Sequence, residues 1–126
     1  MRKRTKIMII DDSYANRILF RAVLEELDIE VTEVHSANKA LSILNKVKPD
    51  IILLDMCMPM MSGIEFLQNL KELKKVIPVI VVSVLDDQSQ IKEAFFYGAS
   101  DYLIKPIESD ELVKCISRFT ECEVII

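Results

Sequence analysis

The chain has 126 residues, 51% hydrophobic and 29% charged, with a formal net charge of −4. This is the composition of one globular domain, and the negative charge argues against a nucleic-acid-binding surface. No apolar run approaches the roughly 18 residues that span a membrane, and the basic start from Arg2 to Lys6 lacks a signal-peptide core. Cys57, Cys115 and Cys122 have no metal-ligand spacing, which favours a reducing cytoplasmic setting.

The first half of the chain is predicted to form two strands, each followed by a helix. The aliphatic run from Ile7 to Ile10 is typical of a buried strand, and Ser13 can cap the next helix. That helix continues to about Leu27, and a strand with β-branched residues follows over Ile29 to His35. A second helix must end before Pro49. The apolar residues at helical spacing are Ile18, Leu19, Ala22, Val23 and Leu27, then Ala37, Ala40, Leu41 and Leu44.

The second half continues the alternation with three more strands and three more helices. Ile51 to Leu54 and Pro78 to Val82 are aliphatic runs typical of buried strands, and Asp101 to Ile104 forms a fifth strand. Ser62 to Glu65 is a capping box that opens a helix, and Asp87 can cap the next one. The apolar residues expected to face the core are Leu67 and Leu70, then Ile91, Ala94 and Phe95, then Leu112, Cys115, Ile116 and Phe119.

This alternation with short connections predicts an α/β fold, a doubly wound parallel sheet with helices on both faces. The aliphatic strands near residues 7, 51 and 79 should be central, and the more polar ones near 31 and 102 should be edges. The carboxyl ends of such strands meet at one edge of the sheet. The polar residues that stand there are Asp11, Asp12, Asp55, Ser83 and Lys105.

These five side chains suit phosphoryl transfer. Converging carboxylates repel one another and need a cation, and all-oxygen ligation favours Mg²⁺, with Mn²⁺ as a substitute. Lys105 and Ser83 can each bind one phosphoryl oxygen. Asp55 stands alone at its strand end and is best placed to become an aspartyl phosphate. Taken singly, each residue has an ordinary structural alternative, such as a helix cap or a solvated side chain.

Over nearly its whole length the chain resembles a bacterial response-regulator receiver domain of the chemotaxis-regulator type. The resemblance implies a flavodoxin-like (βα)5 sheet with strand order 2-1-3-4-5. It also implies a receiver domain over residues 1–120, with residues 121–126 as a tail or a truncated linker. The matching segments are Ile9 to Asp12, Asp55 to Pro59 with Gly63, Pro78 to Ser83, and Gly98 to Pro106.

The resemblance implies a magnesium site at the acidic residues. Asp55 matches the phosphoacceptor, and Asp12 and Asp55 match direct magnesium ligands. Asp11 matches a ligand that acts through water, and Cys57 matches a position that contributes only its backbone carbonyl.

The resemblance also implies a switch. Ser83 and Lys105 match the hydroxyl and the lysine that hold the phosphoryl oxygens, and Tyr102 matches an aromatic residue that swings inward with the hydroxyl. The bond from Lys105 to Pro106 matches one that is cis in the family. Phe96 and Tyr97 are expected off the inward stripe of their helix, beside Tyr102, as part of the partner face.

The implied function is a phosphoprotein of a two-component system or phosphorelay. A sensor histidine kinase or phosphotransfer protein donates to Asp55, and the face built from the fourth helix, the fifth strand and the fifth helix then changes its partner. That partner is a downstream protein or a missing output domain. Binding of this domain to nucleic acid or to a membrane is not expected, and a phosphorylation-dependent homodimer is an alternative that the sequence leaves open. The only catalysis expected is of its own phosphorylation and dephosphorylation.

Two other functions stay open from the residues alone. A magnesium-dependent phosphohydrolase with an aspartyl nucleophile is one, although Cys57 stands where such an enzyme would have a second acid. A phosphorylation-independent interaction module is the other, although all the site acids are intact. Cys57 and Leu85 flank the path of attacking water in the family, and neither orients water well, so we expect a long-lived phosphoryl group.

Overall fold

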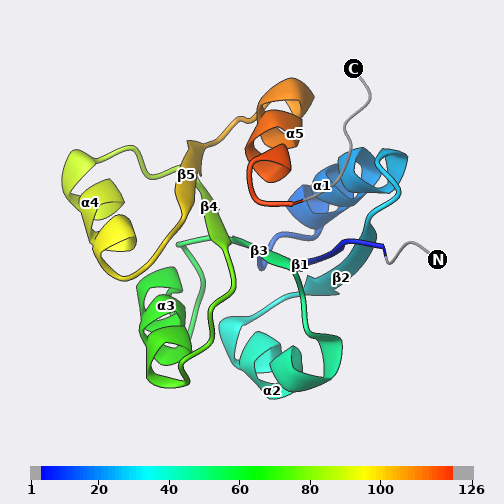
Figure 1. Cartoon of the computed structure of the whole chain (residues 1–126). Coiled ribbons are helices and arrows are strands. Elements are labelled where there is room, and N and C mark those ends of the chain that lie inside the picture. The colour runs from blue at the N-terminus through cyan, green and yellow to red at the C-terminus, as the bar shows by residue number, and fades with distance from the viewer. Residues whose placement is uncertain (1–3, 121–126) are drawn as a thin grey trace.

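The computed structural model describes residues 4–120, which form the predicted alternation of strands and helices (Figure 1). The strands are β1 (Lys6–Ile10), β2 (Glu30–Val34), β3 (Ile51–Leu54), β4 (Val79–Ser83) and β5 (Asp101–Ile104). The helices are α1 (Tyr14–Glu26), α2 (Ala37–Val47), α3 (Gly63–Glu72), α4 (Gln88–Phe96) and α5 (Ser109–Ser117). The expected tail, residues 121–126, lies outside the described residues.

All strands pair in parallel, in the order β2-β1-β3-β4-β5, which confirms the predicted fold class and the predicted edges. The central strands β3 and β4 are buried at every residue, whereas β2 and β5 contain half-buried and exposed positions. A strand covered on both faces must be apolar throughout, so the uninterrupted aliphatic runs had to lie in the middle.

Helices cover both faces of the sheet and create two cores. On one face, α2, α3 and α4 pack on side chains such as Met8, Ile52 and Val81. On the other face, α1 and α5 pack on the alternate side chains of the same strands, such as Ile9, Leu53 and Ile80. Figure 1 shows the two layers on opposite sides of the twisted sheet. Because successive side chains point to opposite faces, each central strand supplies both cores.

The predicted helix caps are present. The Ser13 side chain accepts a hydrogen bond from the Asn16 backbone N–H, and Asp87 accepts one from Ser89. Ser62 and Glu65 form both halves of a capping box at the start of α3. Each cap supplies partners to N–H groups that the first turn of a helix leaves free, so these starts are set locally.

Two inward-facing predictions are wrong in detail. Phe95 is 44% exposed, and of the predicted stripe of α4 only Ala94 is fully buried. In α1, Ile18 and Leu19 are 43% and 64% exposed, while Leu24 is the buried residue. α1 contacts the core through its C-terminal half, so apolar residues in its first turns remain at the surface.

Candidate phosphorylation site

The register of the sheet brings the candidate residues to one edge. Asp11 and Asp12 follow β1, and Asp55 follows β3, whose last residue pairs with the last residue of β1. The Asp55 backbone N–H donates to Ile10 O at 2.9 Å, which continues this ladder. Lys105 follows β5, and its N–H donates to the carbonyl of Ser83 at the end of β4, at 2.8 Å. Four neighbouring strands thus deliver their polar residues to the same place.

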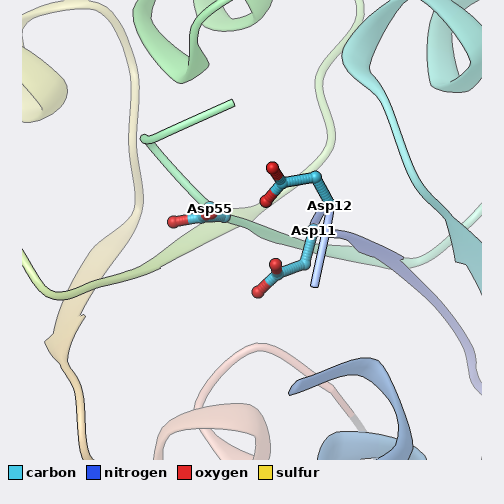
Figure 2. Close-up of side chains that lie close together, drawn as sticks. All are labelled: Asp11, Asp12 and Asp55. Carbon is cyan, nitrogen blue, oxygen red and sulfur yellow. The ribbon is translucent and has the colours of Figure 1, made fainter. Parts of the chain in front are cut away.

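The three carboxylates form a compact cluster. Each of Asp11, Asp12 and Asp55 offers an oxygen, and these oxygens all lie within 4.8 Å of one another. Figure 2 shows the three side chains gathered at the ends of β1 and β3. Asp11 is 1% exposed and Asp55 is 7% exposed, whereas Asp12 lies at the surface. The cluster is therefore open to solvent on the side of Asp12.

Lys105 contributes a positively charged ammonium group to this cluster. Its Nζ lies 3.0 Å from Asp11 Oδ2 and 3.8 Å from Asp55 Oδ1, and its side chain is 14% exposed. One ammonium balances one of the three carboxylates, which leaves two negative charges close together. Oxygen donors with that surplus charge fit a hard divalent cation.

The negative charge of Asp55 is destabilised by its surroundings. Burial raises the pKa of its carboxyl group above the ordinary value of 3.8, and the neighbouring Asp11 raises it further. Lys105 opposes this rise, as does the hydrogen bond that the Cys57 backbone N–H donates to Asp55 Oδ1 at 3.3 Å. Asp55 is thus a poorly solvated carboxylate that any added positive charge would stabilise.

Asp11 is held in place by the start of α1. Its side chain accepts hydrogen bonds from the Ser13 backbone N–H at 2.8 Å and from Asn16 Nδ2 at 3.4 Å. Its backbone carbonyl accepts one from Arg17 Nη1 at 2.7 Å. Asn16 was not among the predicted site residues. The signal in the sequence is its position, in the first turn of a helix that Ser13 caps directly after Asp11 and Asp12.

Ser83 and Tyr102 lie at the other side of the site. Ser83 is fully buried, and its hydroxyl oxygen accepts a hydrogen bond from the Leu85 backbone N–H at 3.2 Å. The Tyr102 hydroxyl donates to the Leu85 carbonyl at 2.7 Å, so both side chains contact the loop after β4. Burial raises the pKa of the Tyr102 hydroxyl, and interaction with the Ser83 side chain partly opposes this rise.

The loop after Asp55 packs tightly against α3. A Cβ atom on Gly63 would lie 2.5 Å from Met56 Sδ, 2.9 Å from Met56 Cα and 3.1 Å from the Asp55 carbonyl oxygen. Only glycine fits this close approach, which holds the Asp55 backbone against the helix. The Cys57 side chain is exposed, and the peptide bond between Lys105 and Pro106 is cis.

The aromatic residues of α4 differ from the expected exposed pair. Phe96 is 74% exposed, but Tyr97 is half-buried and packs against the core beside α4. The two rings meet edge to face, with centroids 5.0 Å apart and planes at 88°. The exposed aromatic surface of α4 therefore consists of Phe95 and Phe96, with Tyr97 as its partly buried support.

This fold and site define a two-component receiver. Residues 7–117 match the family model described as "Response regulator receiver domain", and the chain belongs to this family. It is 33% identical over 114 residues to sporulation initiation phosphotransferase F of Bacillus subtilis, covering 90% of this chain and 92% of that protein. Its structure is similar to that of the chemotaxis protein CheY4 of Vibrio cholerae, with a TM-score of 0.88, 26% identity, and coverage of 94% of this chain and 100% of that one.

Receiver-like sequence also occurs within longer relatives. The chain is 33% identical over 110 residues to the DNA-binding transcriptional regulator NtrC of Klebsiella pneumoniae. The aligned region covers 87% of this chain but only 24% of that longer protein. Within residues 4–120, no helix is long and apolar enough to cross a membrane.

Proposed function

We propose that this receiver is a phosphorylation switch, in which Asp55 accepts a phosphoryl group from a histidine kinase or a phosphotransfer protein. The observation that carries the proposal is the convergence of three carboxylates and Lys105 at the carboxyl edge of the sheet. Structural carboxylates are normally solvated or paired one to one, whereas here two are buried and share one ammonium group. The similarity to a protein named as a phosphotransferase agrees with this chemistry.

Mg²⁺ is the metal that we assign to the site. Asp12 and Asp55 would bind it directly, Asp11 through water, and Cys57 through its backbone carbonyl. When bound, the ion would supply two positive charges that neutralise the acid cluster and the phosphoryl oxygens. The surplus of two negative charges and the solvent-facing Asp12 support this assignment.

The chain's own residues account for the transfer. A carboxylate oxygen of Asp55 attacks phosphorus, and the bond from phosphorus to the donor atom breaks, so that the donor leaves with that electron pair. Lys105 stabilises the charge that develops on one phosphoryl oxygen, and Ser83 donates its hydroxyl to another. The protein catalyses only this transfer and the later hydrolysis of the aspartyl phosphate, in which water attacks phosphorus, the Asp55 carboxylate leaves and inorganic phosphate is released.

The output follows from movement of Ser83 toward the phosphoryl group. The loop after β4 would move with it because Ser83 and Tyr102 both contact Leu85. The surface of α4, β5 and α5, with Phe96, Tyr97 and Tyr102, would then change its preference for a downstream protein, a second copy or an output domain. We assign the receiver domain to residues 1–120 and the protein to the cytoplasm.

Intact-mass measurement tests the proposal. The wild-type protein and Asp55→Asn are incubated with Mg²⁺ and acetyl phosphate, with size exclusion alongside. The expected result is one phosphoryl group on the wild type and none on the variant. The same addition to Asp55→Asn would overturn the assignment of Asp55, and sustained release of phosphate from simple esters would favour the phosphohydrolase instead.

Magnesium should stabilise the fold. At a concentration tenfold above its dissociation constant, the ion adds about 1.4 kcal/mol to the free energy of unfolding, because it binds only the folded site. Asp12→Asn removes most of this gain, whereas Glu72→Gln, at an exposed carboxylate on α3, keeps it. Thermal unfolding with and without Mg²⁺ measures the effect, and an equal gain in Asp12→Asn would contradict the assigned ligand set.

The phosphoryl group should persist for minutes or longer. Neither the exposed Cys57 thiol nor the partly buried Leu85 side chain can orient an attacking water molecule well. Cys57→Asn supplies a group that can do so and should shorten the lifetime at least about tenfold. Intact mass after removal of acetyl phosphate follows the decay, and loss within seconds in the wild type would refute this prediction.

A further inference from the structure

A second polar surface lies at the amino ends of the strands, on the opposite side of the sheet from Asp55, which follows the carboxyl end of β3. It surrounds the positions where β3 and β4 begin and where α2 and α3 end. Exposed lysines gather there on a chain whose net charge is −4. We call them the lysine patch; its members are Lys46, Lys48, Lys71, Lys74 and Lys75.

Helix dipoles explain only part of this patch. Lys46 and Lys71 lie in the last turns of α2 and α3, where a positive charge stabilises the helix. Lys48 and Lys74 lie beyond those turns, with left-handed φ values of 53° and 56°. A lysine costs more free energy than glycine in this conformation. The same conformation occurs at Asp28 and Met60, so it does not by itself indicate a role for these lysines, whereas their charge and their place beside a depression do.

Two lysines of the patch, Lys48 and Lys75, line a depression together with three apolar residues. Its volume is about 510 Å³, and it is lined by Leu44, Asn45, Lys48, Pro49, Lys75 and Ile77. Lys75 Nζ donates to Asn45 Oδ1, which joins the rim between α2 and the segment after α3. Two exposed apolar side chains flank Lys74 and Lys75 in the sequence, Leu73 at 54% exposure and Val76 at 97%.

The patch has little opposing charge around it. Among residues 4–120, no carboxylate forms an ion pair with any of its lysines. The nearby acids in the sequence are Glu72, which is exposed, and Asp50, whose side chain accepts a hydrogen bond from the Lys6 backbone N–H. The lysine charges are therefore available to a partner.

We propose that the lysine patch docks an acidic segment of a partner protein, with one apolar side chain of that segment in the depression. The carboxylates of the segment would pair with Lys48, Lys75 and the lysines around them. The acidic remainder of the chain repels such a partner elsewhere and so directs it to this surface. A flat anionic membrane would not use the depression, and a nucleic-acid surface would favour arginine and aromatic residues, which the patch lacks.

Fluorescence anisotropy tests the docking with a labelled peptide in which one leucine is flanked by glutamates. At low salt, Lys48→Glu with Lys75→Glu should weaken binding at least about tenfold, because attraction becomes repulsion. The matched control, Lys39→Glu with Lys114→Glu, changes the same charge on exposed lysines elsewhere and should bind within about twofold of the wild type. Replacing the leucine of the peptide with serine should also weaken binding.

Two further readouts separate docking from folding and from the phosphorylation site. Lys48→Gly relieves the left-handed backbone, so the melting temperature should stay level or rise while peptide binding weakens. Phosphoryl uptake by Asp55 should be the same in all these variants. Equal binding by the patch and control variants, no binding at low salt, or binding to anionic vesicles but not to the peptide would overturn the proposal.

Discussion

Lys105→Ala is expected to slow phosphoryl transfer from acetyl phosphate to Asp55 by about 10²–10³-fold. The ammonium group lies within 3.8 Å of Asp55 Oδ1, so it can reach a phosphoryl group attached there. No other described cation forms an ion pair with Asp11 or Asp55. Its removal therefore takes away charge stabilisation that the rest of the site cannot replace.

The same change should tighten magnesium binding. Lys105 Nζ lies 3.0 Å from Asp11 Oδ2, where it would compete with a bound metal ion for the negative charge of the cluster. Loss of the rate together with equal or tighter metal binding would separate the role of Lys105 in transfer from a general collapse of the site. Single-turnover mass spectrometry measures the rate, and titration with Mg²⁺ measures the affinity. Lys114→Ala, at an exposed lysine on α5, is the control, and an unchanged rate in Lys105→Ala would contradict the assigned role.

Asp55→Asn is expected to raise the free energy of unfolding at neutral pH by about 1–2 kcal/mol. Burial is the largest cause of the raised Asp55 pKa, and the neighbouring acids add to it, so the folded protein holds this charge at a cost. Asparagine has nearly the same shape and carries no charge. Functional sites often keep such destabilising groups because the chemistry needs them.

The pH dependence of this effect has a definite sign. The carboxyl group of Asp55 has a higher pKa in the folded protein than the 3.8 of an ordinary aspartate. Its destabilising contribution is therefore fully present above the folded pKa and disappears as the pH falls toward 3.8. The advantage of Asp55→Asn over the wild type should shrink across this window.

Urea unfolding followed by circular dichroism, at several pH values and without Mg²⁺, measures this difference. Asp12→Asn is the comparison, because it removes an acid of the same cluster that lies at the surface. Its effect should be the smaller of the two, since water already solvates that charge. If Asp55→Asn is less stable than the wild type at neutral pH, or if its advantage grows on acidification, then burial is not the main determinant of the energetic cost of the Asp55 charge.

Most of the fold was determined by local sequence. The short aliphatic runs from Ile7, Ile51 and Val79 predicted strands buried on both faces, and Ser13, Ser62 and Asp87 set helix starts through bonds within one turn. Parallel strands joined by short connections then place all their carboxyl ends at one edge. The positions of the site acids after the strands were therefore readable before any contact was known.

The tertiary structure decided the contacts that depend on strand register and helix orientation. Lys105 and Asp11 are 94 positions apart, and only the order of the strands brings their side chains to 3.0 Å. Periodicity placed Phe95 inside and Phe96 with Tyr97 outside, but the way in which α4 packs on the sheet exposes Phe95 and partly buries Tyr97. The lysine patch likewise joins the ends of α2 and α3. Sequence spacing determines which residues share a strand or helix, whereas packing between elements determines what those residues touch.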